Sequence, residues 1–310
     1  MPSFWTHAAF AWECHQLLTH LHESGMPVGG SASAILHCPH PFYTGMQGPD
    51  LFFFYPPTAL GRIRLSSLLH TKRTASLLCS LLEIAHSFPP EDRPCALSYA
   101  WGFLGHYLLD SATHPFVYAH AGTHRSAKNL CAHNALESDL DGWSVRRSLG
   151  VSICHLPRPN SYQLTKKERR ILSSLFSQTV GEVWGLSLSP ALVGRAFRSM
   201  EIATGLLYDA QGRKATLARF LERPLGHPYF SPLFLGESRY FADPANLAHR
   251  KWIDPYTGKA SRADFFRLYD GALYRFLPLL RRLESPDLPP SARRLILERL
   301  CRRDFHGEPI

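Results

Sequence analysis

The sequence predicts an all-α protein. Apolar residues recur at the spacing of a helical face in four long stretches, and no run alternates polar and apolar residues for long, as a strand would. The stretches cover residues 10–21, 65–84, 97–109 and 171–183. Segments rich in glycine and proline separate them and mark helix ends, because both residue types interrupt helical backbone. These segments are residues 25–30, 88–94, 155–159, 224–232 and 285–290.

The composition is that of a folded chain with an uneven distribution of charge. Of the 310 residues, 45% are hydrophobic and 19% are charged, which suffices for a sizeable core. Residues 1–155 carry nine Lys and Arg against ten Asp and Glu, whereas residues 156–310 carry 25 against 15. A basic second half would attract anionic lipid, nucleic acid or a phosphorylated substrate, and scattered solvated arginines are an equally good interpretation.

Several sequence features favour a cytoplasmic protein. The seven cysteines are odd in number and contain no C-x-x-C pair, which is typical of reduced thiols. The N-terminus lacks the basic and apolar regions of a signal peptide. The most apolar stretch, residues 96–119, is interrupted by two histidines and an aspartate, which a bilayer would penalise. We expect one helical domain over residues 1–283 and a basic helical tail over residues 284–310.

Histidine is concentrated where the most informative motif lies. Fourteen of the 17 histidines fall in residues 1–155, which metal binding would explain. His106, Asp110 and His114 follow one another at intervals of four. On a helix, His106 and Asp110 lie roughly 40° apart on one face and can share a metal ion, whereas His114 is about 12 Å along the axis from His106. Asp110 is therefore placed to bridge two ions. Pro115 predicts a helix end at His114, because proline disfavours continued helix.

A second pair repeats the spacing. His133 and Glu137 are also four residues apart and, with His114, could complete a second nitrogen and oxygen site. One such pair alone is more often a hydrogen-bonded core pair or a capping group. Two pairs within about thirty residues favour metal, because burying acids and histidines on apolar helices is costly unless a cation neutralises them.

The order of these motifs, H-x-x-x-D and then H-x-x-x-E, resembles the zinc-dependent phospholipase C family. This family includes bacillary phospholipase C and clostridial alpha-toxin, and its zinc core is similar to that of single-strand-specific fungal nucleases. Three further positions resemble the family's order along the chain: Thr6-His7, Gly48-Pro49-Asp50 and Leu69-His70. The resemblance covers roughly residues 5–145. It implies a multi-helix bundle around a multinuclear metal site. The charge count, and not the resemblance, indicates that a basic helical half follows over residues 156–283.

The resemblance implies two to three zinc ions. By the family's pattern, His70, His106 and Asp110 would hold one ion with help from Asp50; His114, His133 and Glu137 a second; and His7 with Asp110 a third. The third site is open, because secreted members use an N-terminal tryptophan there and Trp5 is internal. His120 or His124 is an alternative to His114, and Asp139 and Asp141 are candidates to orient imidazoles.

The implied activity is hydrolysis of a phosphodiester, phospholipid above all, by metal-activated water. Asp50 would orient that water or take its proton, and a role as plain metal ligand or turn former is as well supported. The basic half would make peripheral contact with an anionic membrane surface. Two alternatives remain open: a nuclease or nucleotide phosphodiesterase with the same zinc chemistry, and a metal-stabilised binding protein without turnover. The aromatic run at residues 52–55 would form core or line a wall of the site.

Overall fold

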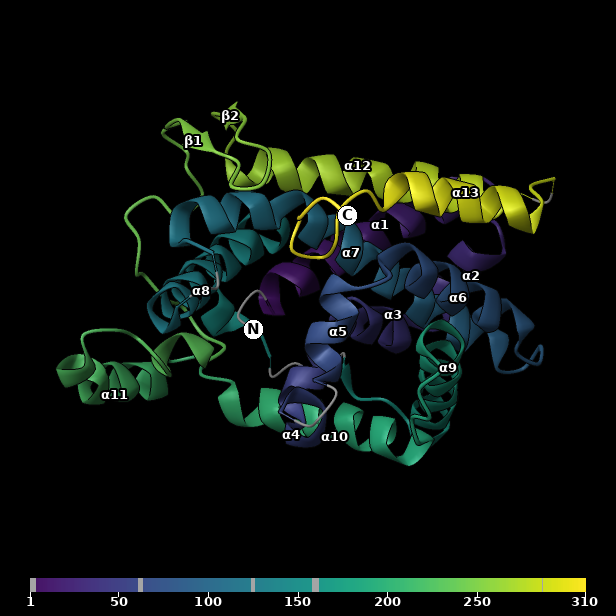
Figure 1. The fold of residues 1–310 in the computed structure, drawn as a ribbon, viewed down its shortest axis with the longest axis horizontal. Coiled ribbons are helices and arrows are strands. Elements are labelled where there is room, and N and C mark those ends of the chain that lie inside the picture. The colour runs from purple at the N-terminus through teal and green to yellow at the C-terminus, as the bar shows by residue number, and fades with distance from the viewer. Residues whose placement is uncertain (1–3, 61–63, 124–125, 158–161, 286) are drawn as a thin grey trace.

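A computed structural model confirms the predicted all-α class (Figure 1). The structure describes residues 4–60, 64–123, 126–157, 162–285 and 287–310. Within these ranges the regular structure is helical except for one antiparallel pair of short strands, β1 (Trp252–Ile253) and β2 (Ala260–Ser261), in which Trp252 pairs with Ser261.

The long helix α7 (Arg93–Ala121) forms the centre of the fold. It is buried on all sides, as expected of a helix that is apolar all round and enclosed by others. The helices that pack against it are α1 (Phe4–Glu23), α2 (Gly30–His37), α3 (Pro39–Gly45), α6 (Thr74–Ser87), α8 (Ala127–Leu149), α9 (Lys166–Trp184) and α12 (Phe265–Leu283). None of the described helices, α7 included, combines the length and the apolar character that crossing a bilayer requires.

Helix α7 does not end near Pro115, so the expectation of a helix end at His114 is wrong. The helix continues to Ala121. The proline removes one backbone hydrogen bond, but the turn after it is held by packing, since Phe116 is fully buried. Gly307 of the C-terminal segment packs directly against the ring of Pro115. A Cβ atom on Gly307 would lie 2.6 Å from that ring. Tertiary packing therefore outweighs the lost hydrogen bond.

The apolar stretch at residues 65–84 forms two helices where the sequence predicted one. α5 (Leu65–Thr71) and α6 are separated at Arg73, whose φ of 55° lies in the left-handed region. The Arg73 guanidinium donates a hydrogen bond to the backbone carbonyl of Val183. The break allows α5 to pack against the 3-10 helix η1 (Gly48–Phe54), and this contact brings His70 to Asp50.

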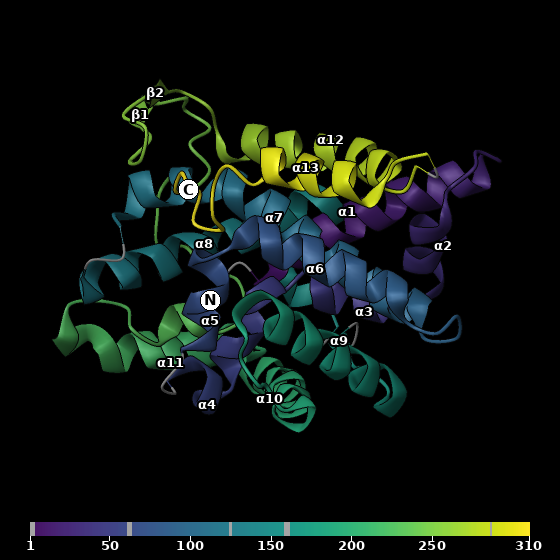
Figure 2. The ribbon, with the colours of Figure 1, turned by 45° about the vertical axis from the view of Figure 1, so that its right-hand side comes forward.

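The second half of the chain wraps around this core. α9 packs against α6 and α7, and α10 (Pro190–Leu207) packs against α9 and η1. α11 (Arg213–Glu222) projects from the lower left of the molecule, whereas α12 and α13 (Pro290–Leu300) form its upper edge, in both Figure 1 and Figure 2. The remaining short elements are α4 (Pro56–Ala59), η2 (Ile153–His155), η4 (Arg223–Leu225) and η5 (Ser231–Leu233).

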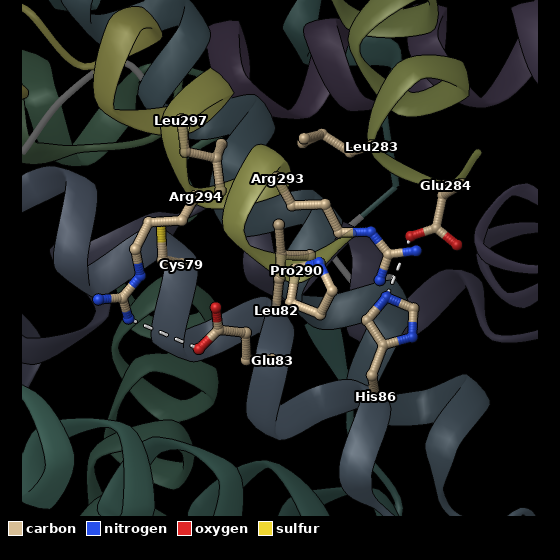
Figure 3. Close-up of a pocket in the computed structure, with 10 residues that line it drawn as sticks. All are labelled: Cys79, Leu82, Glu83, His86, Leu283, Glu284, Pro290, Arg293, Arg294 and Leu297. Atoms are coloured by element: carbon tan, nitrogen blue, oxygen red, sulfur yellow. Dashed lines mark hydrogen bonds and ion pairs between the residues drawn. The ribbon is translucent and has the colours of Figure 1, made fainter. Parts of the chain in front are cut away.

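The C-terminal segment packs on the rest of the fold. α13 packs on α6 around a cavity of about 200 Å³ (Figure 3). At its rim Arg294 lies 3.7 Å from Glu83, and His86 lies 3.2 Å from Glu284. Beyond α13 the chain turns into the core, where Phe305 is fully buried. The segment thus closes the bundle next to the histidine-rich region of α7.

Candidate metal centre

The eight predicted ligands converge on one region from five elements. They are His7 on α1, Asp50 on η1, His70 on α5, His106, Asp110 and His114 on α7, and His133 and Glu137 on α8. All are buried except Asp50, which is half-buried. Their ligand atoms form three groups, within each of which all atoms lie within 4.8 Å of one another: His7, His106 and Asp110; Asp50, His70 and His106; His114, His133 and Glu137. The structure thus contains three neighbouring groups that could hold metal ions.

Asp110 lies between these groups. Its Oδ1 is 3.1 Å from His7 Nε2, and its Oδ2 is 2.9 Å from His106 Nε2. The same Oδ2 is 3.6 Å from His114 Nδ1, which belongs to the third group. His70 pairs instead with Asp50, at 3.0 Å. The exact ligand set and the bridging role of Asp110 remain predictions, and the geometry that bridging requires is present.

Three of the imidazoles are oriented by backbone carbonyls. The Nδ1 atoms of His70, His106 and His114 lie 2.7, 3.0 and 2.8 Å from the carbonyl oxygens of Ser66, Met46 and Phe305. A carbonyl only accepts, so each Nδ1 carries a proton and donates it, and Nε2 of the neutral ring presents a lone pair. That lone pair faces a carboxylate oxygen, which is also an acceptor. Two buried acceptors in contact need a second proton or a cation between them.

The donor set fits a metal ion. Backbone-anchored imidazoles with a free Nε2 are the usual form of metal-binding histidine. The separations between Nε2 and carboxylate oxygen run from 2.9 Å at His106 to 3.5 Å at His114 and Glu137. Two ligands of a tetrahedral zinc ion are separated by about 3.3 Å. Imidazole and carboxylate donors at this spacing are therefore compatible with a bound divalent metal ion.

The carboxylates keep their charge despite burial. Burial alone would raise the pKa of Asp110, but His106, His114 and His7 outweigh it and hold that pKa well below its ordinary value. Burial also opposes ionisation of Glu137, and His133 and His114 again lower its pKa well below normal. Burial would lower the pKa of His114, but the two carboxylates raise it to about 9. The negative potential that retains this proton would equally attract a divalent cation.

Part of the centre opens to a cavity of about 380 Å³. The ligands that line it are Asp50, His70, His114, His133 and Glu137. Its apolar wall is formed by Phe53, Tyr118, Leu130 and Leu233. The aromatic run that follows Asp50 is therefore divided, because Phe52 is fully buried in the core whereas Phe53 faces the cavity. A molecule in the cavity would meet one face of the centre, with His7 and Asp110 behind it.

Gly48 explains why the aspartate loop lies against α7. Its φ is +50°, a region that favours glycine, and a Cβ there would lie 2.3 Å from the ring of His106. The absence of a side chain lets the loop approach the imidazole, and Asp50 follows two residues later. The Gly48-Pro49-Asp50 sequence thus has a steric role in the centre as well as a chemical one.

The sequence did not indicate that the C-terminal segment contributes to the site. The ring of His306 lines the cavity and stacks on that of His70, with centroids 5.5 Å apart. Phe305 accepts the bond from His114 through its carbonyl, and its N–H donates to the carbonyl of His70 at 3.1 Å. Asp304 holds the turn by accepting the N–H of His306 at 2.9 Å. Helical spacing relates only residues a few positions apart, so it could not indicate that residues 304–306 lie next to ligands between positions 7 and 137.

Among the described residues, the alternative ligand and the two acids expected to orient imidazoles are not part of the three groups. His120 donates through Nδ1 to the Phe116 carbonyl at 2.8 Å and packs near Trp252, outside the three groups. His124 lies outside the described residues. Asp139 accepts the N–H groups of Tyr240 and Phe241. Asp141 accepts from the N–H and hydroxyl of Thr6, at 2.7 Å each. These two acids therefore hold backbone segments in place and do not orient imidazoles, although the sequence had suggested that role. Asp141 holds the start of α1, next to His7.

Asp141→Asn should change how stability depends on pH. Burial raises the pKa of Asp141 to about 7, whereas an aspartate in an unfolded chain titrates near pH ~3.9. The folded chain then holds a proton that the unfolded chain releases, so the wild type loses up to about 4 kcal/mol between roughly pH 4 and pH 7. The variant, whose amide oxygen can still accept from Thr6, lacks this loss. Urea titrations in chelator should show the variant gaining stability relative to wild type across that window; parallel pH profiles would contradict the assignment.

Comparisons of the chain with protein-family models, with curated proteins and with solved structures found no match. The similarity to zinc-dependent phospholipase C therefore stays a prediction that rests on the two motifs and their order along the chain.

Proposed function

We propose that the protein is a zinc-dependent phosphodiester hydrolase with a phospholipase C-like metal core. The observation that supports this most is the clustering of three neighbouring groups of imidazoles and carboxylates, two of which contribute side chains to the lining of one cavity. A structural core would rarely retain so many ionisable side chains, because burying them without a cation is costly. Zinc ions held there would neutralise a phosphate and acidify a bound water.

Asp50 is the residue proposed to act on that water. Its side chain is 18% exposed, whereas that of Asp110 is 5% exposed, so Asp50 is the more accessible from the cavity. Burial would raise its pKa, but a His70 ring that carries the second proton donates to Asp50 and lowers that pKa through the hydrogen bond and its charge, so that the carboxylate is ionised at neutral pH. An ionised carboxylate at the cavity floor can orient a water molecule and accept its proton.

The cavity wall favours a phosphodiester with an apolar substituent. Phe53, Tyr118, Leu130 and Leu233 would face the part of the substrate beyond the phosphate. This suits the glycerol and acyl portion of a phospholipid. The rings of Phe53 and Tyr118 could instead stack on a nucleobase. This supports a nuclease or nucleotide phosphodiesterase as the second candidate.

Metal content and turnover test the proposal together. Protein purified without chelator should contain about two to three zinc ions per chain, as the three groups allow. Asp50→Asn should retain most of the zinc and lose about a hundredfold or more in turnover. The matched control is Asp287→Asn, at an exposed position, which should change neither. Short-chain phosphatidylcholine, a chromogenic phosphodiester and single-stranded DNA serve as substrates.

The possible outcomes separate the hypotheses. Zinc content near zero would remove the premise. Zinc without hydrolysis of any of the three substrates would favour a metal-stabilised binding protein. Hydrolysis of the DNA alone would favour the nuclease.

A further inference from the structure

Helix α11 exposes the face that an ordinary surface helix would bury. Leu217, Phe220 and Leu221 follow the i, i+3, i+4 spacing of one helical face, and they are 61%, 61% and 65% exposed. Leu225, in the short helix that follows, extends the apolar face and is 55% exposed. Such a stripe normally packs against a core. Here it points away from the protein.

Polar contacts on the opposite face hold the helix in this orientation. Glu222 is 5% exposed and accepts the backbone N–H groups of Phe230 and Ser231. The guanidinium of Arg219 lies 4.6 Å from the centre of the Tyr240 ring. Because a buried carboxylate and these partners fix the inner face, the outward position of the leucines is determined by the fold.

Helix α10 continues the same surface. Arg195, Arg198, Ile202 and Leu206 are exposed and lie within a narrow sector of the helix by their spacing, with Ile202 54% and Leu206 66% exposed. Lys214 in the first turn of α11 donates to the carbonyl of Leu206 at 2.7 Å, which places the end of α10 against α11. The α10–α11 surface is defined here as Ile202, Leu206, Leu217, Phe220, Leu221 and Leu225 with the basic residues around them.

The exposed charge on this segment is of one sign. Residues 190–236 contain six Lys and Arg and three acids. The acids are engaged: Glu201 pairs with Arg169 at 2.9 Å, Asp209 accepts the N–H of Ala215, and Glu222 is buried as described. All six basic residues are exposed: Arg195, Arg198, Arg213, Lys214, Arg219 and Arg223. Arg219 lies on the inner face of α11, against Tyr240. A second copy of the chain meeting this surface symmetrically would bring these cations together.

The surface lies next to the cavity of the candidate centre. The short helix η5 packs against both α11 and α8, and its Leu233 lines the cavity wall. Leu130 of α8 lines the same wall and is 46% exposed. In Figures 1 and 2, α11 lies at the opposite edge of the molecule from α12 and α13.

We propose that the α10–α11 surface docks the protein onto an anionic phospholipid bilayer. Exposed leucine, isoleucine and phenylalanine enter the boundary between head groups and acyl chains, and surrounding arginine and lysine side chains bind lipid phosphates. Aliphatic side chains favour this partner over nucleic acid, which proteins bind mainly through phosphates, base edges and stacking on aromatic rings. The inference deepens the proposed function, because docking here would bring the cavity to the lipid that supplies its substrate.

Vesicle binding tests the proposal without using turnover. Full-length protein is sedimented with vesicles of phosphatidylcholine alone or of equal parts phosphatidylcholine and phosphatidylserine. The double variant Phe220→Ala, Leu221→Ala should lower the partition coefficient on the mixed vesicles by about tenfold or more. Its control is Tyr274→Ala, Leu295→Ala, which removes exposed side chains from α12 and α13 (77% and 45% exposed) and should bind as wild type.

A charge variant tests the electrostatic part. The double variant Arg213→Gln, Arg223→Gln should bind the mixed vesicles more weakly, by about fivefold for each charge removed. Its control is Arg281→Gln, Arg299→Gln, which removes two exposed charges from α12 and α13 and should bind as wild type. Sedimentation velocity of the same proteins detects self-association. Any of three results would overturn the proposal: wild-type protein does not bind the mixed vesicles; Phe220→Ala, Leu221→Ala binds them as well as its control does; or wild-type protein forms a dimer that this variant loses. Hydrolysis of a soluble phosphodiester is measured separately, so that failure of docking is distinct from failure of the proposed function.

Discussion

Asp110→Asn is expected to lower zinc content by at least one ion per chain and turnover by about a hundredfold or more. Both carboxylate oxygens of Asp110 contact imidazoles, at 3.1 Å from His7 and 2.9 Å from His106. Asparagine retains the shape but loses the charge and replaces one acceptor with a donor. The variant therefore weakens the group of His7, His106 and Asp110 directly, and this group shares His106 with a second one.

The same substitution should also destabilise the protein in chelator. Removing one partner of a buried charged cluster costs about 3–5 kcal/mol, because the remaining charges are left uncompensated. The depressed pKa of Asp110 means that this stabilisation is present at neutral pH and is lost only as the pH falls through that depressed pKa. Asp141→Asn is the comparison, since Asp141 is equally buried but lies outside the three groups. It should leave zinc content unchanged and should not lose stability at neutral pH, because its pKa is raised and not lowered. Unchanged zinc content in Asp110→Asn, measured by elemental analysis, would end the bridging hypothesis.

Phe305→Ala is expected to lower the free energy of unfolding by about 3–5 kcal/mol. The ring is fully buried and packs against Phe103, Tyr107 and His106, with centroids 5.2 to 5.9 Å apart. Its removal leaves a cavity where the C-terminal segment enters the core. The segment also holds His114 through the Phe305 carbonyl, so loss of packing should loosen that imidazole.

Urea denaturation with and without chelator distinguishes the two effects of Phe305→Ala. We expect a loss of stability in both conditions and a larger loss when zinc is present, because a displaced His114 weakens the third group. Ile310→Ala, which is 63% exposed a few residues further on, is the control and should change stability by less than about 0.5 kcal/mol. A Phe305→Ala variant as stable as Ile310→Ala would show that the segment does not close the core.

The site could be predicted best where it depends on geometry within one helix. His106 with Asp110, and His133 with Glu137, are brought together by a spacing of four that any helix imposes. In the structure the two pairs are 2.9 and 3.2 Å apart. The rise per residue also indicated that Asp110 stands between His106 and His114. Local geometry thus accounts for most of the centre on α7 and α8.

Local rules failed where packing competes with them. Pro115 predicted a helix end, but burial on both sides of the proline carries α7 on to Ala121. The apolar period over residues 65–84 predicted one helix, but Arg73 adopts a left-handed conformation and divides it. In each case the two local backbone conformations differ little in free energy. Burial of apolar area in the tertiary arrangement contributes more, and it decides which conformation forms.

What the sequence by itself determined is the helical class, the pairing of His106 with Asp110 on α7 and of His133 with Glu137 on α8, and the concentration of histidine in the first half. His7, Asp50 and His70 were indicated only through a family resemblance, and their convergence was decided by the packing of α1, η1 and α5. The entry of Phe305 and His306 into the site, and the outward face of α11, were decided by tertiary structure alone. Spacing along a chain specifies distances within one helix, whereas contacts between helices depend on how all the apolar faces are buried together.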